Sequence, residues 1–242
     1  MKKKILLITA VITLVFLGCS KSEKLDLVTL SEDSKELYYE ETYQIRANSD
    51  SELTYAIENR FHGEVSESGL VTAGRVGETE IIVSNNEDSK KFKLTVVPKH
   101  NLYPEPDFDF GSTKEDIKAL LGEPKTETET SLGYIDYSVA APGLALLFDE
   151  NNKLSSYGLM VKSTFSSKLA DHLLEYYMPI SVKDGLAMFI NSNTAETTTK
   201  IIGMSLYSYQ YWQVLYIPKP DTDDLRSVKE LSTLFENIEI DL

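Results

Sequence analysis

Between residues 25 and 98, apolar and polar positions alternate in short runs separated by polar turns. The clearest run is 91–97, in which Phe92, Leu94 and Val96 alternate with polar residues. Successive side chains of a strand point to opposite faces, so this run predicts a strand with one buried face. Three similar runs are 43–47, 53–57 and 80–84. Short strands at this spacing, without a helical stretch between them, predict an all-β sandwich over residues 25–98.

A helical pattern opens the part of the chain that follows residue 110. The run Ser112-Thr113-Lys114-Glu115 has the form of a capping box, and Ile117, Leu120 and Leu121 then form an apolar stripe. Gly122 and Pro124 stop the pattern, which predicts a helix over 113–121. Three strand signals follow at 132–139, 144–148 and 154–161, with an asparagine-containing hairpin turn at 149–153.

The same order of elements is repeated once. Ser166 or Ser167 caps a second predicted helix, with Leu169, Ala170, Leu173 and Tyr177 on one side, and Pro179 ends it. Strands are predicted at 186–191, 198–207 and 211–217. A last amphipathic helix is predicted from Asp221, and its apolar stripe contains Leu225, Val228, Leu231, Leu234, Phe235 and Ile238. The pattern predicts an α+β domain over 111–242, with an antiparallel sheet and tandem α-β-β-β units.

Residues 99–110 form the predicted linker between the sandwich and the α+β domain. Pro104 and Pro106 stiffen it, and such spacing is typical of segments that hold two domains apart. Within it, acids and aromatics alternate over residues 107–110. This alternation favours a short edge strand over a calcium site, because no further calcium-loop spacing follows.

The first nineteen residues have the pattern of an export signal. Lys2 to Lys4 precede thirteen residues, Ile5 to Leu17, that are apolar except for two threonines. This run is short for a membrane span, which needs ~20 residues, and it fits the h-region of a signal peptide. A signal peptide cut elsewhere and an N-terminal anchor helix are the alternatives.

The residues around Cys19 carry a resemblance. Phe16-Leu17-Gly18-Cys19 resembles the lipobox of bacterial lipoproteins, although that family favours Leu at position 16 and a small residue at position 17. The resemblance implies a signal peptide at 1–18, lipid attachment at Cys19 and a tether over 19–24. Ser20, where Asp would mark inner-membrane retention, favours the outer membrane. The periplasmic or surface orientation stays open.

A second resemblance covers the predicted sandwich. The stretch 64–74, EVSESGLVTAG, resembles the V-S-x-x-G-x-V-T-A segment of bacterial immunoglobulin-like group 2 domains. Residues 76–81 and 93–97 match the segments that follow in that family, whereas Tyr55 stands where the family usually has Trp. The resemblance implies an immunoglobulin-like fold and a role as a spacer or adhesion module. Gly69 and Gly77 also suit tight turns that need a positive φ.

A third, shorter resemblance lies at the first predicted helix. Residues 111–124, GSTKEDIKALLGEP, are similar to the helix opening of SmpA/OmlA-type and β-lactamase-inhibitor-protein-like α/β lipoproteins. Members of those families are built from helix–strand–strand–strand units and bind proteins. The resemblance implies a non-enzymatic protein-binding module.

Charge excludes one class of partner. The chain has 24 Lys and Arg against 38 Asp and Glu, a formal net charge of −14. Loss of residues 1–18 would remove three lysines and leave −17. Nucleic-acid binding needs clustered Lys and Arg, so the composition argues against it. Cys19 is the only cysteine, which excludes a disulfide framework and a thiolate-rich metal site.

The sequence contains no motif of a known catalytic or cofactor site. It lacks a nucleophile elbow, a dinucleotide fingerprint, a phosphate loop and a zinc-protease helix. His62, His100 and His172 are far apart in sequence; we interpret His62 as a solvated loop residue and His172 as part of a solvated helix face. We therefore predict no catalytic residues, no metal, no cofactor and no enzyme. A carboxylate-based glycosidase pair is the enzymatic alternative.

One aromatic stretch is a candidate binding site. Tyr207, Tyr209, Tyr211 and Trp212 lie within six residues and would offer a stacking platform for a sugar or a protein if exposed. The competing interpretation places Trp212, Val214 and Tyr216 in the core of a strand, and we favour it. The leading hypothesis is an envelope lipoprotein that binds another envelope protein, and the alternative is a carbohydrate-binding lipoprotein.

Overall fold

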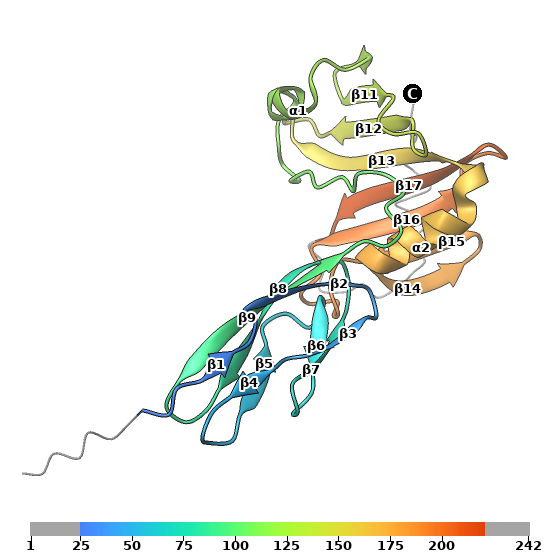
Figure 1. Ribbon diagram of the computed structural model, residues 1–242. Helices are drawn as coiled ribbons and strands as arrows, with labels where there is room; N and C mark the ends of the chain where they lie inside the picture. The colour runs from blue at the N-terminus through green and yellow to red at the C-terminus, as the bar shows by residue number, and fades with distance from the viewer. Residues whose placement is uncertain (1–24, 221–242) are drawn as a thin grey trace, which may run out of the picture.

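The structure is a computed structural model that describes residues 25–220, and most of this part is antiparallel β-sheet (Figure 1). The predicted signal peptide, Cys19 with its tether, and the helix predicted from Asp221 lie outside the described residues. Within residues 25–220, no helix is long and apolar enough to cross a membrane.

The N-terminal part contains nine short strands in three sheets. A four-stranded sheet has the order β2 (Ser34–Tyr38), β9 (Ser89–Val97), β8 (Gly77–Ser84), β5 (Thr54–Ile57). A three-stranded sheet has the order β3 (Thr42–Gln44), β7 (Leu70–Ala73), β6 (Gly63–Val65), and β1 (Thr29–Leu30) pairs with β4 (Ala47–Asn48). Only the pairing of β2 with β9 is parallel among these strands.

One hydrophobic core lies between these sheets, as in a β-sandwich. Its buried residues are Val28, Leu37, Ile45, Val71, Ala73, Ile81, Val83, Phe92, Leu94 and Val96. The alternation predicted for 91–97 is confirmed, because Phe92, Leu94 and Val96 are at most 1% exposed. Burial of such apolar side chains on one face is the main driving force for packing one sheet on another.

Two glycines sit where the sequence predicted positive φ. Gly69 has a φ of 80° and Gly77 a φ of 141°. A Cβ on Gly69 would lie 2.7 Å from a ring carbon of Tyr55, and one on Gly77 would overlap the ring of His62. Glycine is therefore required at both turns by conformation and by space.

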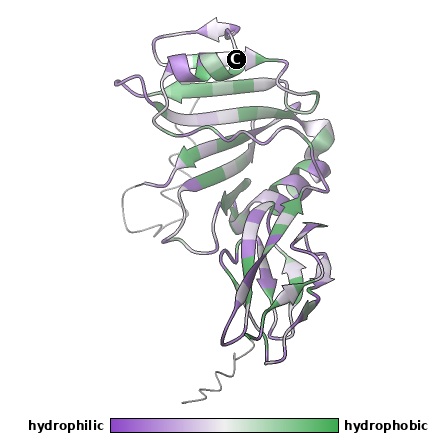
Figure 2. Ribbon diagram, turned by 60° about the vertical axis from the view of Figure 1, so that its left-hand side comes forward, coloured by the Kyte–Doolittle hydropathy of each residue, from purple (hydrophilic) through white to green (hydrophobic). Residues whose placement is uncertain are grey.

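The C-terminal part is built on one eight-stranded antiparallel sheet. Its elements in chain order are α1 (Lys114–Leu121), β10 (Thr126–Glu127), β11 (Ser131–Ile135), β12 (Gly143–Phe148), β13 (Leu154–Lys162), the 3₁₀-helix η1 (Ser163–Phe165), α2 (Ser166–Tyr176), β14 (Met178–Lys183), β15 (Leu186–Ile190), β16 (Lys200–Leu206) and β17 (Tyr211–Pro218). The spatial order is β10-β11-β12-β13-β17-β16-β15-β14. Figure 2 shows long apolar stretches on the strands of this sheet.

The sheet is a repeat of two units, each a helix followed by four strands. The last strands of the two units, β13 and β17, pair at the centre, with Tyr157 opposite Tyr216. The prediction of three strands per unit was wrong by one strand in each. The two-residue strand β10 is too short for a periodic signal. Pro179 was predicted to end the second helix, which does end before it at Tyr176; but Pro179 lies in β14, next to a register shift in an edge strand, where proline is tolerated.

The helix boundaries follow the sequence closely, but their caps do not. The first helix is capped by Thr113 and Asp116 rather than by Ser112 and Glu115, and Gly122 ends it with a φ of 81°. At α2 the N-cap is Phe165, which makes no side-chain cap. The expected cap at Ser166 or Ser167 was wrong, since Ser166 is the first helical residue.

The segment 99–110 packs onto the sheet. Tyr103 and Phe108 are 2% and 6% exposed and belong to the main core of the sheet. The edge strand expected at 107–110 is absent from the structure, which places no strand between β9 and α1. The side chain of Phe108 is held instead by core packing, with its ring edge against Tyr157.

Candidate functional site

The predicted aromatic site is divided between surface and core. The side chains of Tyr207 and Tyr209, in the turn between β16 and β17, are 54% and 84% exposed. Trp212 is half-buried against the main core, and its indole N–H donates to the hydroxyl of Ser166 at 2.8 Å. Val214 and Tyr216 are fully buried, as the competing interpretation required. The four predicted residues therefore do not form one exposed platform.

The backbone of this turn is fixed against η1. The N–H of Ser163 donates to the carbonyl of Gln210 at 2.8 Å, and the Ser163 hydroxyl donates to the carbonyl of Tyr209 at 2.9 Å. These two hydrogen bonds hold the backbone of the turn, while the rings of Tyr207 and Tyr209 remain exposed. A rigid turn that presents exposed aromatic rings loses little conformational entropy when it binds a partner.

Further exposed apolar side chains lie at the same end of the sheet. Ile135 of β11 pairs with Gly143 of β12, Gly143 pairs with Met160 of β13, and Met160 pairs with Gln213 of β17. The end of β11 and the start of β17 therefore lie at the same end of the sheet. Ile135, Val139, Leu206, Tyr207 and Tyr209 are each at least 54% exposed. We call these five residues the distal surface. Leu206 is opposite Trp212 on the face of the main core, whereas Ile135 is in register with Gln213 and points to the other face, so the five side chains share one end of the sheet but not one face. Exposed aromatic and aliphatic side chains at such an end are typical of interaction sites.

The distal surface lies at the far end of α2 from the sandwich. Helix α2 starts next to η1, which holds the turn, and its last turn contacts the sandwich. There the N–H of Val76 donates to the carbonyl of Glu175 at 2.8 Å, and the Arg75 guanidinium donates to the carbonyl of Leu174. Figure 1 shows the sandwich and the β16–β17 turn at opposite ends of α2.

A cavity of about 320 Å³ opens between the linker and the start of α2. It is lined by Lys99, His100, Asn101, Leu102, Val139, Ala140, Phe165 and Lys168. Val139 belongs to both the cavity and the distal surface. A second cavity, of about 430 Å³, is lined mainly by polar residues of the sandwich and the β15–β16 loop. In that cavity, Asn59 and Asn191 use their side-chain oxygens to accept backbone N–H bonds of their own loops, so these oxygens serve the fold.

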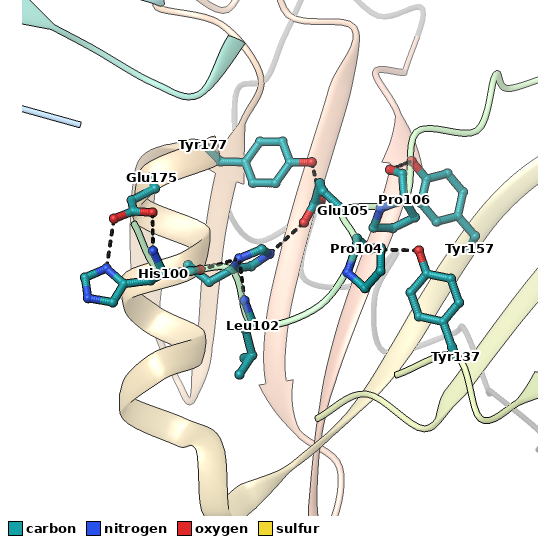
Figure 3. A network of polar contacts seen from close by, with 10 residues as sticks. His100, Leu102, Pro104, Glu105, Pro106, Tyr137, Tyr157, Glu175 and Tyr177 are labelled. Carbon is teal, nitrogen blue, oxygen red and sulfur yellow. Dashed lines mark hydrogen bonds and ion pairs between the residues drawn. The ribbon is translucent and has the colours of Figure 1, made fainter. Parts of the chain in front are cut away.

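His172 and His100 belong to one polar network, in which His172 is buried and the side chain of His100 is 42% exposed; Figure 3 shows the bonds of His100 to Glu175. His172 is 0% exposed, and the predicted solvated face was therefore wrong. Its Nε2 lies 2.8 Å from Oε2 of Glu105, and its Nδ1 lies 2.9 Å from the carbonyl oxygen of His100. Because Nε2 faces a carboxylate oxygen, it carries a proton and donates to Glu105. The backbone N–H of Leu102 also faces Nδ1, at the longer distance of 3.5 Å.

Two glutamates organise this network. Oε1 of Glu105 accepts a 2.5 Å hydrogen bond from the Tyr177 hydroxyl. Glu175, 3% exposed, accepts from the backbone N–H groups of Lys99 and His100 at 2.9 Å each, and its Oε1 lies 2.8 Å from His100 Nδ1. The network therefore ties the linker to α2. Charge-assisted bonds of this kind are stronger than neutral ones.

The electrostatics around Glu105 keep the neighbouring phenols protonated. Burial, and then the charge of Glu105, raises the pKa of Tyr137 and Tyr176 to about 12. The same two causes raise the pKa values of Tyr103, Tyr157, Tyr177 and Tyr216 still further. Protonated phenols remain hydrogen-bond donors, as Tyr177 is toward Glu105.

The His172–Glu105 pair resembles the oriented histidine of a hydrolase, but its geometry does not fit a general base. Both ring nitrogens are engaged, and the side chain has no exposed surface through which a substrate could approach. Its role in this structure is to fix the linker. No local pattern of residues signals this pair, because Glu105 and His172 are 67 residues apart.

His62 is also less solvated than the sequence indicated. Its Nδ1 lies 3.1 Å from the carbonyl oxygen of Arg75, and its ring packs edge-on against Phe61. Within the described residues, no group of three or more His, Cys, Asp or Glu side chains gathers in a way that could hold a metal ion.

No protein-family model matches the chain, and no curated protein matches it. Among solved structures, domains 5–6 of the S-layer protein SbsC are similar at a TM-score of 0.27 and 9% identity, covering 82% of this chain and 86% of that one. A two-domain fragment of human protocadherin-24 has a TM-score of 0.27 and 12% identity, covering 79% and 94%. A SusE-like surface located polysaccharide binding protein from Bacteroides thetaiotaomicron has a TM-score of 0.23 and 9% identity, covering 78% and 34%. At these TM-scores the likenesses establish neither a shared fold nor a shared function.

Proposed function

We propose that this chain is a non-enzymatic lipoprotein of the bacterial cell envelope that binds another envelope protein. In this proposal Cys19 carries the lipid, residues 25–98 form an immunoglobulin-like spacer or adhesion module, and residues 111–242 form the binding module. The linker over 99–110 joins the two. The signal pattern before Cys19 supports the anchor, and the outer membrane is the proposed location because Ser20 follows the cysteine.

The distal surface is the observation that carries the binding role. Tyr209 is 84% exposed and its carbonyl accepts from the Ser163 hydroxyl, and Val139 is 81% exposed in a turn closed by hydrogen bonds between Ser138 and Ala141. Large apolar side chains on a rigid frame are the usual centre of a protein interface. The surface also lies at the end of α2 opposite the sandwich, and therefore away from the anchored terminus.

The repeat of helix and strands supports the second half of the proposal. The two units share the order of a helix followed by antiparallel strands with the α/β lipoproteins that residues 111–124 resemble, although each unit here has four strands instead of three. That resemblance covers fourteen residues only, so the exposed side chains weigh more in the proposal than the fold does.

Carbohydrate binding is the second candidate. It is favoured by two exposed tyrosine rings near a cavity that contains Lys99, Asn101 and Lys168. Sugar recognition would be better served by a groove with Tyr211 and Trp212 in it, but Trp212 is half-buried and bonded to Ser166. For this reason a protein partner comes first.

The test uses the full-length lipidated chain in intact cells. A photo-crosslinking amino acid replaces Tyr209 in one variant and Leu120, which is 67% exposed on α1, in a matched control. The proposal expects a discrete crosslinked envelope protein from the Tyr209 variant that the Leu120 control does not give. Identical products from both variants, or none from either, would refute it. Binding of the chain to a glycan array that is lost in Tyr209→Ala would instead establish the second candidate.

The anchor has a separate test. A clickable fatty-acid analogue is fed to cells that express the chain or its Cys19→Ala variant. Labelling of the chain that disappears in Cys19→Ala supports lipidation at that residue. Unlabelled wild-type chain would remove the lipoprotein part of the proposal without touching the binding part.

A further inference from the structure

The eight-stranded sheet has apolar side chains on both faces. The first face packs on α1, α2 and the linker through the main core, to which Ile117, Leu169, Leu173 and Tyr103 belong. The opposite face carries a separate cluster, which we call the second-face cluster. It consists of Ala145, Met188, Ile190, Ile201, Leu215 and Ile217, with Met178 and Leu186 packed at its rim.

The register confirms that the two clusters lie on opposite faces. Along β17, Val214 and Tyr216 belong to the main core, whereas Leu215 and Ile217 belong to the second-face cluster. Neighbouring strand β16 repeats this alternation with Ile202 and Ile201. Because side chains alternate between faces along a strand, the two sets point in opposite directions.

The second-face cluster is buried, yet its described members all come from strands of the sheet itself. Each of its six core residues is at most 6% exposed, and Met188 and Ile201 are 0% exposed. The described helices contribute to the other face: Ile117 from α1 and Leu169 and Leu173 from α2. A sheet face at this burial needs a further apolar layer over it.

The chain itself supplies a segment of the right pattern and length. Residues 221–242 follow β17, the strand that contributes Leu215 and Ile217, after Pro218 and two further residues. Six of their eight apolar residues share one side of a helix at 3.6 residues per turn: Leu225, Val228, Leu231, Leu234, Phe235 and Ile238. Of the other two, Leu242 falls on the same side and Ile240 does not. Twenty-two residues would make a helix of ~33 Å, whereas the six strands from β12 to β14 span ~24 Å.

We propose that residues 221–242 form an amphipathic helix that packs on the second-face cluster and closes the sheet as a third layer. The segment is the occupant because it begins at the edge of the cluster and presents an apolar stripe that needs a partner. The charged residues of the segment, such as Arg226, Lys229 and Glu236, fall away from the centre of that stripe and would face solvent.

A crosslinking experiment on the full chain tests the contact. A photo-crosslinking amino acid replaces Leu186, which lies partly buried at the rim of the cluster, and Leu120 serves as the exposed control. After irradiation and digestion, the proposal expects Leu186 to be linked to peptides from 221–242 of the same chain, at a yield that does not depend on protein concentration. A crosslinked dimer would show that a second copy covers this face and would overturn the proposal. Absence of any product with 221–242 would overturn it equally.

A pair of charge substitutions gives an independent readout. Phe235→Asp places a carboxylate near the centre of the apolar stripe, and Thr233→Asp places the same group about 160° away around the helix. The proposal expects Phe235→Asp to lower the melting temperature by about 5 °C or more, because a buried carboxylate is costly, and Thr233→Asp to leave it nearly unchanged. Equal effects of the two variants would contradict a helix docked by this stripe.

Discussion

Removal of the carboxylate of Glu105 should loosen the linker from α2. The side chain of Glu105 is 12% exposed and accepts hydrogen bonds from His172, at 2.8 Å, and from Tyr177, at 2.5 Å. In Glu105→Leu both donors lose their acceptor. The Nε2–H of His172 and the hydroxyl of Tyr177 would then both be buried without a hydrogen-bond acceptor.

The expected cost can be worked from these contacts. Loss of a hydrogen bond to a charged acceptor costs about 1.5–3 kcal/mol, and the full burial of His172 places this one at about 3 kcal/mol. The unpaired Tyr177 hydroxyl adds about 1 kcal/mol. For a chain of this size, each kcal/mol lowers the melting temperature by about 2–4 °C. A loss of about 4 kcal/mol therefore predicts a drop of about 8–16 °C.

Thermal unfolding followed by circular dichroism measures this effect. The control is Glu150→Leu, which removes an exposed glutamate in the β12–β13 turn and should change the melting temperature little. His172→Leu and the double variant Glu105→Leu/His172→Leu complete a double-mutant cycle. An apolar pair can replace a buried hydrogen-bonded pair at small cost, so the double variant should be more stable than Glu105→Leu alone. A change below about 1 kcal/mol in Glu105→Leu, or strict additivity in the cycle, would refute the interpretation of a coupled buried pair.

Three further predictions follow from the described geometry. Gly69→Ala should destabilise the chain by about 2–3 kcal/mol because it adds positive-φ strain and a Cβ 2.7 Å from Tyr55, whereas Gly185→Ala, at a similar φ of 84° and with open space, should cost about 1 kcal/mol. Chemical denaturation compares the two variants, and equal costs would exclude a role for the Tyr55 contact. The pKa of Tyr176 is raised from 10.0 to about 12 in the folded chain, so its protonated form stabilises the fold below pH 10 and this stability is lost as the pH rises to about 12. Tyr176→Phe should therefore weaken the alkaline decline in the free energy of unfolding, and an unchanged decline would contradict this. Ser166→Ala removes the acceptor of the Trp212 indole N–H and should lower the free energy of unfolding by about 1 kcal/mol. It should also shift the fluorescence emission maximum of this single tryptophan, and an unaltered maximum would argue against the hydrogen bond.

Local patterns determined most of the secondary structure of this chain. The alternation around Phe92, Leu94 and Val96 identified a strand with one buried face, because strand periodicity is a property of neighbouring residues. Gly122 and Asn152 adopt the positive φ that their positions indicated, at 81° and 58°. The two helices begin and end within a few residues of the predicted limits. Within the aromatic stretch that the sequence singled out, Tyr207 and Tyr209 are exposed in the turn and Trp212 packs on the main core.

Tertiary structure decided the features that depend on residues far apart in sequence. His172 has the helical spacing of a solvated residue, and only the packing of residues 99–105 across α2 buries it against Glu105. The distal surface exists because register aligns the end of β11 with the turn before β17, which no local pattern encodes. Strand β14 was missed because Pro179 is compatible with a strand only at a sheet edge, and the sheet order determines which strand is the edge. The sequence by itself determined most of the elements and their buried faces, because each of these depends on residues a few positions apart. Long-range pairing determined which faces meet, because that depends on how the elements assemble.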